Sequence, residues 1–525
     1  MVILSARKWS QALKNDILIT VRKYRTIILL LGIFLLALLL RFLYFPQNIY
    51  FGFDQARDAF ATLGILKGDL KIVGPPTGVE GLFHGPLYYY LYAPFYFLSN
   101  GDPAYAAGFM RVANALGVFL IFLVGKTIFD KKVGFLAAFL FAISFEQTQY
   151  ALYFNHPSLA VLSVTLFYFG LSLLLFHKQQ KGLILALLGL GLSLQFEFVL
   201  IYLFFTALVL GIVFHRSIPK VSLKVFLVSL GGFLITTCSF ILAEVIFNFR
   251  VLKNLTSIVG GAGGNFSVLD NFYILITRLV SDNIVSHNSG TVLALLFLTI
   301  LFLGFLKNSN NRPKLIFLLI WILGGIIPYI NNKSQTPLYY YSAGAGVGLL
   351  ILYSFFIDKV WEKAKVLALV LILIPIVSNL SLIRQNNPGG VIPTINVQSG
   401  MLLSDEKQVV DYIYNSVLGD KFSVSALTMP LQVNTTWSYL FQWYGQKEYG
   451  FLPVWGENTA AGYPGNLKVI TAKSTLPDTR FLIIEPTRGI RQGLIDNFLR
   501  EEGYFTKVLE EKKIGEFIVQ RRKPF

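Results

Sequence analysis

The stretch Ile27–Tyr44, which reads IILLLGIFLLALLLRFLY, decides the class of fold. Apart from Arg41 it is continuously apolar, whereas a surface helix of a soluble protein keeps a polar side. Runs of about 20 apolar residues, at about 1.5 Å per helical residue, cross a hydrocarbon core roughly 30 Å thick. The run ends in the bulky residues RFLYFP, and a signal-peptide cleavage site needs small residues. We therefore expect an uncleaved transmembrane helix.

The overall composition agrees with an integral membrane protein. Of the 525 residues, 54% are hydrophobic and 14% are charged, against roughly 25% charged residues in a typical soluble domain. Together, the apolar runs predict a polytopic α-helical membrane protein with about 11 transmembrane helices. The only cysteine, Cys238, excludes an intrachain disulfide and leaves the redox compartment open. The predicted spans fall near residues 26–44, 104–126, 133–150, 157–176, 183–198, 199–214, 224–247, 289–306, 315–331, 338–357 and 365–381.

The positions of the basic residues predict the orientation. The net charge is +17, but Lys and Arg concentrate in short stretches between alternate spans, which argues against a nucleic-acid partner. Cytoplasmic loops carry such an excess, so we expect a plasma-membrane protein with a cytoplasmic N-terminus. The odd number of spans then places the C-terminal part outside the cytoplasm. The basic stretches are Arg22–Arg25, Lys126–Lys132, His177–Lys181, Arg216–Lys224, Lys307–Lys314 and Lys359–Lys365.

Three segments are predicted to be extracytoplasmic: the large first loop 45–103, residues 250–287 and the C-terminal part 382–525. A loop as long as the first is usually functional. From residue 382 the strand-like runs FSVSAL, LKVITA, RFLIIEP and EFIVQ alternate with helix-like DEKQVVDYIYNSV and IRQGLIDNFLREEG. This pattern predicts a soluble α/β domain over 382–525 after a membrane domain over 1–381.

The first loop contains the candidate site. Its residues 51–60 read FGFDQARDAF, so Asp54, Arg57 and Asp58 stand at positions i, i+3 and i+4 on one helix face. A solvated set of ion pairs is the plainer explanation of such a triple. The segment 84–98, which begins HGPLYYYL, is too short to span and rich in tyrosine, so we expect it to lie in the membrane interface or to re-enter. Carboxylates beside aromatic rings just above the bilayer suit a reaction at a lipid head group.

Two motifs of this loop resemble those of the GT-C superfamily of polyprenyl-phosphate-dependent glycosyltransferases. DQARDAF is similar to the first-loop signature Asp-Glu-x-Arg-Tyr of lipid A aminoarabinose transferases, which Asp54 and Arg57 match. Gln55 and Asp58 depart from that signature. HGPLYYYL resembles the Lys/His-Pro-Pro-Leu-x-Tyr element, with Gly85 in place of the first proline.

Later segments extend the resemblance over residues 27–360. RVANALGVFL, which begins at Arg111, is similar to the second-span motif Arg-Leu-x-x-Ala-Leu. QYALYFNHPSL resembles the segment that opens the fourth span, with Asn155 where many members carry Asp. LYYYSAGAGVGLL is similar to a late span motif but lacks its Arg and Pro. The chain is closest to the branch of protein O-mannosyltransferase-like and lipopolysaccharide glycosyltransferase-like proteins.

This resemblance implies a reaction and roles for residues. The donor is a sugar linked through phosphate to a polyprenol, the acceptor is an extracytoplasmic protein, lipid or glycan, and transfer inverts the anomeric centre. Asp54 is the candidate general base, and Arg57, His84 and Arg111 are candidates for binding the phosphate or orienting the base. Because Gln55 stands where relatives place Glu, one carboxylate is missing from any mechanism with two acids.

The remaining candidates for substrate binding have structural alternatives. Asp58 and Tyr88 belong to the two loop motifs, and Arg111 could instead pair with Asp58 or with Glu80. Asn155 and His156 stand at the predicted external mouth of a span, where they contact the donor sugar or cap the following helix. Glu197 lies near an external turn, so it is either functional or simply reaches water. Lys333 is an ordinary interface lysine or a phosphate contact.

The sequence contains no metal motif, because its five histidines show no ligand spacing. A divalent ion held by Asp54 and other loop carboxylates is left open, and the absence of a P-loop argues against ATP. A polytopic transporter or flippase is the main alternative, although it does not explain the first loop. An oligosaccharyltransferase is a nearer rival, but LFQWYGQ at 440–446 lacks the aspartate of its signature. The aromatic residues of the C-terminal part form its core or stack on sugars; they are Trp437, Trp443, Tyr444 and Trp455.

Overall fold

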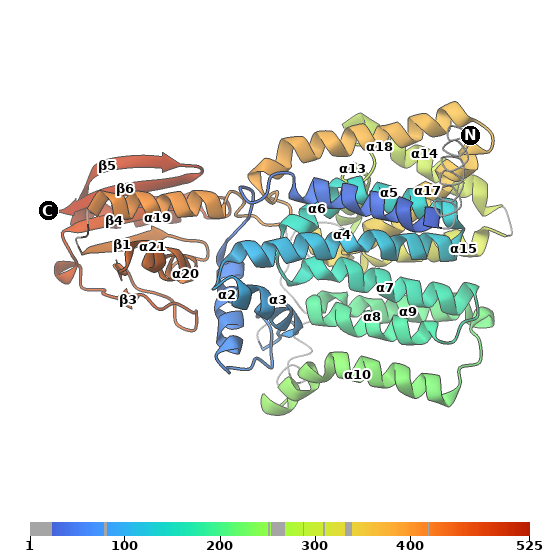
Figure 1. Ribbon diagram of the computed structural model, residues 1–525, viewed down its shortest axis with the longest axis horizontal. Helices are drawn as coiled ribbons and strands as arrows, with labels where there is room; N and C mark the ends of the chain where they lie inside the picture. The colour runs from blue at the N-terminus through green and yellow to red at the C-terminus, as the bar shows by residue number, and fades with distance from the viewer. Residues whose placement is uncertain are drawn as a thin grey trace, which may run out of the picture.

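The computed structural model describes residues 24–77, 81–249, 253, 268–286, 288–307, 310–330, 339–417, 419 and 421–525. A bundle of long helices occupies one end of the elongated molecule, and an α/β domain occupies the other (Figure 1). The two short helices α2 and α3 lie between them (Figure 1). The helices before residue 390 are Tyr24–Phe42, α2 (Phe53–Leu66), α3 (Leu87–Leu98), α4 (Pro103–Ile128), α5 (Lys131–Ile143), α6 (Phe145–Leu152), α7 (His156–Phe176), α8 (Gly182–Phe196), α9 (Tyr202–Val213), α10 (Leu223–Ile246), α13 (Val268–Ser281), α14 (Asn288–Leu306), α15 (Arg312–Gly324), α16 (Ile327–Ile330), α17 (Ala345–Trp361) and α18 (Lys365–Asn386).

Each predicted span falls on helical structure, but several of the helices are shorter than the spans predicted for them. Within the described ranges, seven helices are long and apolar enough to cross a membrane by themselves. The predicted spans 183–198, 199–214 and 338–357 fall on helices α8, α9 and α17, which have 15, 12 and 17 residues. The predicted span 133–150 is two helices, α5 and α6, which meet at Ser144. The protein is thus polytopic, and the number of eleven crossings stays a prediction.

The segment 84–98 contains α3, a helix of 12 residues. At about 1.5 Å per residue this helix is too short to cross a bilayer, which agrees with the predicted interfacial or re-entrant segment. Its tyrosines Tyr88, Tyr89, Tyr92 and Tyr96 are all buried. Helix α3 lies at the end of the bundle that faces the α/β domain (Figure 1).

A close contact between helices α7 and α8 fixes the part of the bundle that matters for the site. A Cβ atom added to Gly189 of α8 would lie 2.4 Å from the backbone nitrogen of Phe167 in α7. Only glycine permits this approach, and small residues at helix contacts are typical of membrane bundles. The hydroxyls of Ser163 and Ser193 also meet across the contact at 2.9 Å. The first residue of α7 and the last of α8 are therefore held at the same end of the bundle.

The C-terminal part forms an α/β domain around a six-stranded sheet with the order β3-β2-β1-β4-β6-β5. Strands β1 to β4 are parallel where they pair, and β6 runs antiparallel to β4 and β5. The predicted strands at FSVSAL, LKVITA, RFLIIEP and EFIVQ and both predicted helices are present, whereas β2 and β5 escaped prediction. The elements are α19 (Leu403–Val417), β1 (Phe422–Leu427), α20 (Thr435–Leu440), α21 (Gln446–Tyr449), β2 (Val454–Trp455), β3 (Lys468–Val469), β4 (Thr479–Ile484), α22 (Gln492–Phe505), β5 (Thr506–Ile514) and β6 (Phe517–Pro524).

The aromatic residues of this domain divide into two groups. Trp437 and Trp455 are buried in its core. Trp443 and Tyr444 are only half-buried, and the ammonium of Lys407 lies over both rings at 4.9 and 4.8 Å from their centres. The core interpretation therefore holds for the first pair alone.

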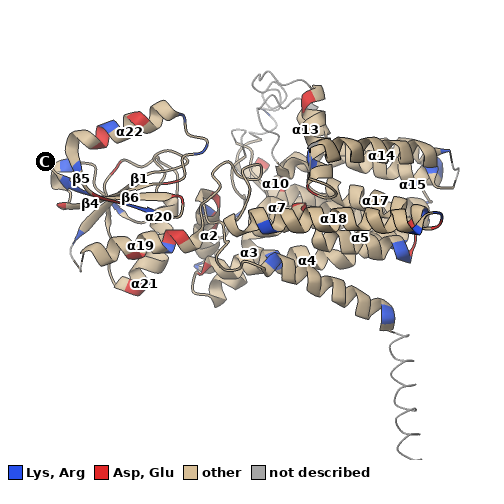
Figure 2. Cartoon of the chain, turned by 90° about the horizontal axis from the view of Figure 1, so that it is seen from above, with Lys and Arg blue, Asp and Glu red and all other residues tan. Residues whose placement is uncertain are grey.

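The α/β domain is joined to the bundle by backbone pairing. The backbone nitrogen of Phe51 donates to the carbonyl of Met401 at 2.9 Å, and that of Leu403 donates to Ile49 at 2.9 Å. The first described helix starts at the end of the bundle away from this junction (Figure 1). Lysine and arginine also gather at that far end (Figure 2). This distribution is the one expected if the far end is cytoplasmic.

Candidate functional site

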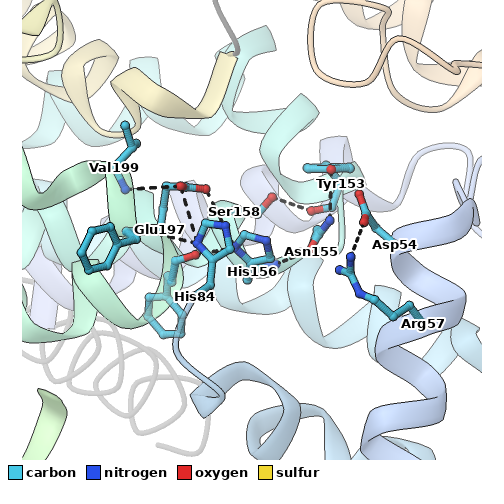
Figure 3. Close-up of polar contacts among 11 residues, drawn as sticks. Asp54, Arg57, His84, Tyr153, Asn155, His156, Ser158, Glu197 and Val199 are labelled. Atoms are coloured by element: carbon cyan, nitrogen blue, oxygen red, sulfur yellow. Dashed lines mark hydrogen bonds and ion pairs between the residues drawn. The ribbon is translucent and has the colours of Figure 1, made fainter. Parts of the chain in front are cut away.

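A cavity of about 570 Å³ lies at the end of the bundle that faces the α/β domain. Six of the nine predicted site residues line it, although they come from four separate segments. These six are Asp54, Arg57, His84, Asn155, His156 and Glu197. Figure 3 shows the Asp54–Arg57 pair on one side of the site and the two histidines with Glu197 on the other.

Helix α2 supplies the acidic and basic pair. The Nη1 atom of Arg57 lies 2.7 Å from Asp54 Oδ1, and its Nε donates to Asp58 Oδ1 at 2.8 Å. The Asp54 side chain is 33% exposed, whereas that of Asp58 is 4% exposed. Asp54 thus faces the cavity, and Asp58 holds Arg57 from behind. The solvated ion-pair explanation does not apply to the Arg57–Asp58 half, because both side chains are largely buried.

Gln55 has a structural position. Its side-chain oxygen accepts a hydrogen bond of 3.2 Å from the backbone nitrogen of Gly52, which precedes α2. This contact is half of a capping box, in which glutamine serves as well as glutamate. The departure from the family signature at this position therefore preserves the start of the helix that carries Asp54 and Arg57.

His84 is fixed by a short turn packed against the end of α8. Its backbone nitrogen donates to the carbonyl of Pro75 at 2.9 Å, and the backbone nitrogen of Gly85 donates to the backbone carbonyl of Gln195 at 3.0 Å. A Cβ atom on Gly85 would lie 2.1 Å from the side-chain oxygen of Gln195 and 2.8 Å from its Cα. Glycine at this position therefore lets His84 approach Glu197, with 3.6 Å between His84 Nδ1 and Glu197 Oε1.

Helix α7 brings the third polar segment. The side chain of Asn155 caps the helix by accepting a hydrogen bond of 2.7 Å from the nitrogen of His156. Its amide nitrogen donates to the hydroxyl of Tyr153 at 3.0 Å. The rings of His156 and His84 lie 4.2 Å apart, centre to centre. Asn155 therefore caps the helix and also lines the cavity, and its contact with a donor sugar stays a prediction.

Burial shifts the pKa values of His84 and Asp58 in opposite directions. Burial lowers the pKa of His84 well below its ordinary value, and the neighbouring His156 and Arg57 lower it further. Burial also raises the pKa of the Asp58 carboxyl to about 6, against the opposing effect of Arg57. Glu197 lies between α8 and the 3₁₀ turn Phe198–Ile201. Its Oε1 accepts a hydrogen bond of 3.5 Å from the backbone nitrogen of Val199. Its position excludes the interpretation that it simply reaches water, because it is 2% exposed.

Three predicted residues do not line the cavity. Asp58 lies behind Arg57, and Tyr88 is fully buried with its ring 5.4 Å from that of His156. The prediction that Arg111 binds substrate has no support from its position, because Arg111 does not line the cavity. Its guanidinium donates to the carbonyl of Arg41 at 2.8 Å and to Asn48 Oδ1 at 2.9 Å, inside the bundle. Arg111 therefore has a structural role without the proposed partner Asp58. Glu80 and Lys333 lie outside the described residues.

Several cavity residues were not singled out from the sequence. Tyr153, Tyr340 and Tyr341 form part of the wall, and so do Pro75, Pro76 and Thr77. The signal that could have found the tyrosines is their clustering beside motifs at the predicted external ends of spans. Nothing in the local sequence distinguishes the 75–77 turn.

One group of residues has the composition of a metal site. Within the described ranges, His84, His156 and Glu197 are the group of three whose ligand atoms all lie within 4.8 Å of one another. The open prediction of an ion held by Asp54 and loop carboxylates has no such geometry among the described residues. The nearest charged partner of Asp54 is Arg57.

Part of the sequence and the overall fold are similar to those of known proteins. Residues 83–242 match the family model of dolichyl-phosphate-mannose-protein mannosyltransferase, and no curated protein matches the chain in sequence. The structure of ArnT from Cupriavidus metallidurans in the apo state has a TM-score of 0.59 at 13% identity and covers 94% of this chain and 97% of its own. The structure of ArnT from Cupriavidus metallidurans bound to undecaprenyl phosphate has a TM-score of 0.58 at 13% identity, and the match covers 95% of this chain and 98% of ArnT. The chain thus matches a mannosyltransferase family model over residues 83–242, and its fold is similar to that of ArnT.

Proposed function

We propose that the protein transfers a sugar from a polyprenyl-phosphate donor to an extracytoplasmic protein, lipid or glycan, with Asp54 as the general base. The observation that carries this proposal is the cavity in which Asp54, Arg57 and the His84 segment meet. It combines a partly exposed carboxylate, an arginine and polar groups in one enclosure, which suits a sugar joined to phosphate.

An apolar groove beside the cavity suits the polyprenyl chain. The groove has a volume of about 240 Å³ and shares Leu82, His84, Phe198 and Ile201 with the cavity. It continues along α10, past Phe240 and other side chains. A donor with its phosphate in the cavity and its isoprenoid chain in this groove would place its charge next to polar groups and its tail next to apolar ones. The similar fold of ArnT, which was solved with undecaprenyl phosphate, supports this assignment.

The geometry supports a simple mechanism. Asp54 accepts the proton of the acceptor nucleophile, whose electron pair attacks the anomeric carbon of the donor sugar. The bond between that carbon and the phosphate oxygen breaks, and its electrons go to the departing lipid phosphate. Arg57 stabilises this charge, since its planar guanidinium binds phosphate oxygens in pairs. Attack opposite the leaving group inverts the anomeric centre.

The test is sugar transfer in membranes that contain the full-length protein, with a panel of radiolabelled polyprenyl-phosphate sugars. We expect transfer by the wild type and a loss of about 10²–10⁴-fold in Asp54→Asn, because general-base catalysis typically contributes that much. Asp69→Asn is the matched control. Asp69 lies in the same loop, is exposed and pairs only with Lys71 among the described residues.

Each result has a distinct meaning. Transfer that survives Asp54→Asn would assign the base to another residue. A wild type that transfers no sugar from any donor, but moves labelled lipid across the bilayer, would replace the enzyme by the transporter alternative. Loss of transfer in both variants would indicate a general effect of the loop charge.

A further inference from the structure

The buried group of His84, His156 and Glu197 is the most unusual polar cluster of the protein. The three side chains are 8%, 7% and 2% exposed and come from separate segments. All three nevertheless line the cavity. A buried carboxylate is stabilised by a positive partner or by hydrogen bonds to both oxygens. Among the described residues, the basic groups within 4 Å of the Glu197 carboxylate are these two imidazoles, at 3.6 and 3.9 Å.

One oxygen of Glu197 lacks a partner. Its Oε1 accepts from the nitrogen of Val199, whereas no described group forms a hydrogen bond with the buried Oε2. His156 does not supply that bond, because its Nδ1 is already bonded to the carbonyl of Phe196. The unsatisfied oxygen lies 3.9 Å from His156 Nδ1. It is a vacant acceptor inside a cluster that contains two further metal-binding side chains.

The separations fit a metal ion between the three groups. Zinc binds histidine nitrogen and carboxylate oxygen at about 2.0–2.2 Å, so tetrahedral ligands stand about 3.4 Å apart. The observed distance of 3.6 Å between His84 Nδ1 and Glu197 Oε1 is close to that value. Small side-chain movements within the 4.8 Å cluster would complete the geometry.

The surroundings of the histidines also match those of metal ligands. A carbonyl oxygen only accepts, so the contact with Phe196 fixes the proton of His156 on Nδ1 and leaves the Nε2 lone pair free. Metal-bound histidines usually donate their other nitrogen to a carbonyl in this way. His84 Nδ1 accepts a single backbone hydrogen bond of 3.2 Å from Phe198. A cation at that nitrogen would displace this one bond.

We propose that His84, His156 and Glu197 bind a divalent cation of the zinc class, with one coordination position open to the cavity. Two histidines and one glutamate are a known ligand set of catalytic zinc sites, whose fourth position takes water or substrate. Here that position would receive an oxygen of the donor phosphate, an extension that rests on the proposed function. The binding of the metal itself does not depend on it.

The test measures zinc in the purified full-length protein, without donor or acceptor. We expect about one zinc ion per chain after desalting, and zinc affinity lowered by more than about 100-fold in Glu197→Gln and His84→Asn, since loss of outer-shell partners alone costs about 10–100-fold. His215→Ala is the control for adventitious binding, because His215 is exposed and lies between α9 and α10. Thermal unfolding confirms that each variant is folded.

X-ray absorption of the zinc-loaded wild type provides a test that needs no variant. We expect two imidazole nitrogens at about 2.0–2.1 Å together with oxygen ligands. The proposal would be overturned if the wild type contains no zinc, or if the absorption spectrum shows only sulfur ligands or only oxygen ligands. Unchanged zinc affinity in Glu197→Gln would also overturn it. Glu197 would then hold a proton instead. Asp54→Asn separates the two proposals, because it should keep zinc while losing transfer. Zinc binding without any transfer would leave this site standing and reject the proposed function.

Discussion

Arg57 is the residue that organises the first-loop motif. It joins the cavity-facing Asp54 to the buried Asp58 through contacts of 2.7 and 2.8 Å. Its guanidinium also lies over the ring of Phe53, 5.4 Å from the centre. A lysine has one charged nitrogen and would not hold both carboxylates in a fixed plane. The motif thus positions the proposed base through Arg57, and Asp58 acts on Asp54 only indirectly.

We predict that Asp58→Asn becomes more stabilising as the pH rises. Burial raises the pKa of Asp58 to about 6 in the folded protein, against about 3.9 in an unfolded chain. The folded state therefore binds the proton more tightly, and wild-type stability falls between about pH 4 and 6, by about 1.4 kcal/mol per unit of pKa difference. Asparagine resembles the protonated form at every pH.

The measurement is the melting temperature of Asp58→Asn minus that of the wild type, at about pH 4.5 and about pH 7. The difference should increase towards neutral pH. Asp69→Asn, a change at an exposed carboxylate, should show no such increase. A difference for Asp58→Asn that is the same at both pH values would contradict the prediction.

At the scale of elements, the site depends on where two helices begin and end. Helix α7 begins at His156 and α8 ends just before Glu197. Gly189 brings the two helices into backbone contact, so both residues reach the same end of the bundle. The Gly85 turn then adds His84 from the first loop. Rigid helices and one tight turn therefore position this half of the cavity.

We predict that Asn155→Ala destabilises the protein by about 1 kcal/mol, because the cap of α7 is lost. Asn155→Asp keeps an oxygen acceptor and should unfold at nearly the wild-type temperature. Thermal unfolding in detergent checks both variants. If Asn155 also contacts the donor sugar, Asn155→Asp will change the KM for the donor while stability is kept. Equal stability of the alanine variant and the wild type would refute the capping role.

At the scale of the whole molecule, Tyr439 couples the α/β domain to the first loop. Its hydroxyl donates to the carbonyl of Gly101 at 2.5 Å. Its buried ring lies 5.4 Å from that of Phe51 and 5.3 Å from that of Phe60, which belongs to α2. Helix α2 also carries Asp54, so the position of the proposed base depends on contacts with the domain above it.

We predict that Tyr439→Ala costs about 3–5 kcal/mol of stability, as for other large aromatic residues in cores. Tyr439→Phe keeps the ring and should cost only about 0.5–1.5 kcal/mol for the lost hydrogen bond. Melting temperatures measure the loss of stability. Limited proteolysis between residues 387 and 402 measures how far the α/β domain detaches from the helix bundle. Tyr504→Ala is the control, since Tyr504 is an exposed tyrosine of α22. Similar effects of Tyr439→Ala and Tyr504→Ala would show that the contact does not couple the two parts.

The sequence by itself determined the features that depend on local pattern. Continuous apolar runs predicted helices wherever the structure has the long ones, because burial in lipid requires apolar side chains on every face. Period-two and helical patterns likewise predicted most of the α/β domain. The spacing of Asp54 and Arg57 predicted their pairing, since positions i and i+3 meet on any helix.

Only the tertiary structure decided which distant residues meet. His84, His156 and Glu197 carry no ligand spacing in the chain, and they converge because Gly85 and Gly189 allow close backbone contacts. Arg111 matched a family motif, yet the fold surrounds it with Asn48 and the backbone of Arg41 inside the bundle. Local pattern depends on neighbours along the chain, whereas burial and coordination depend on neighbours in space. Packing therefore placed this site where spacing could not.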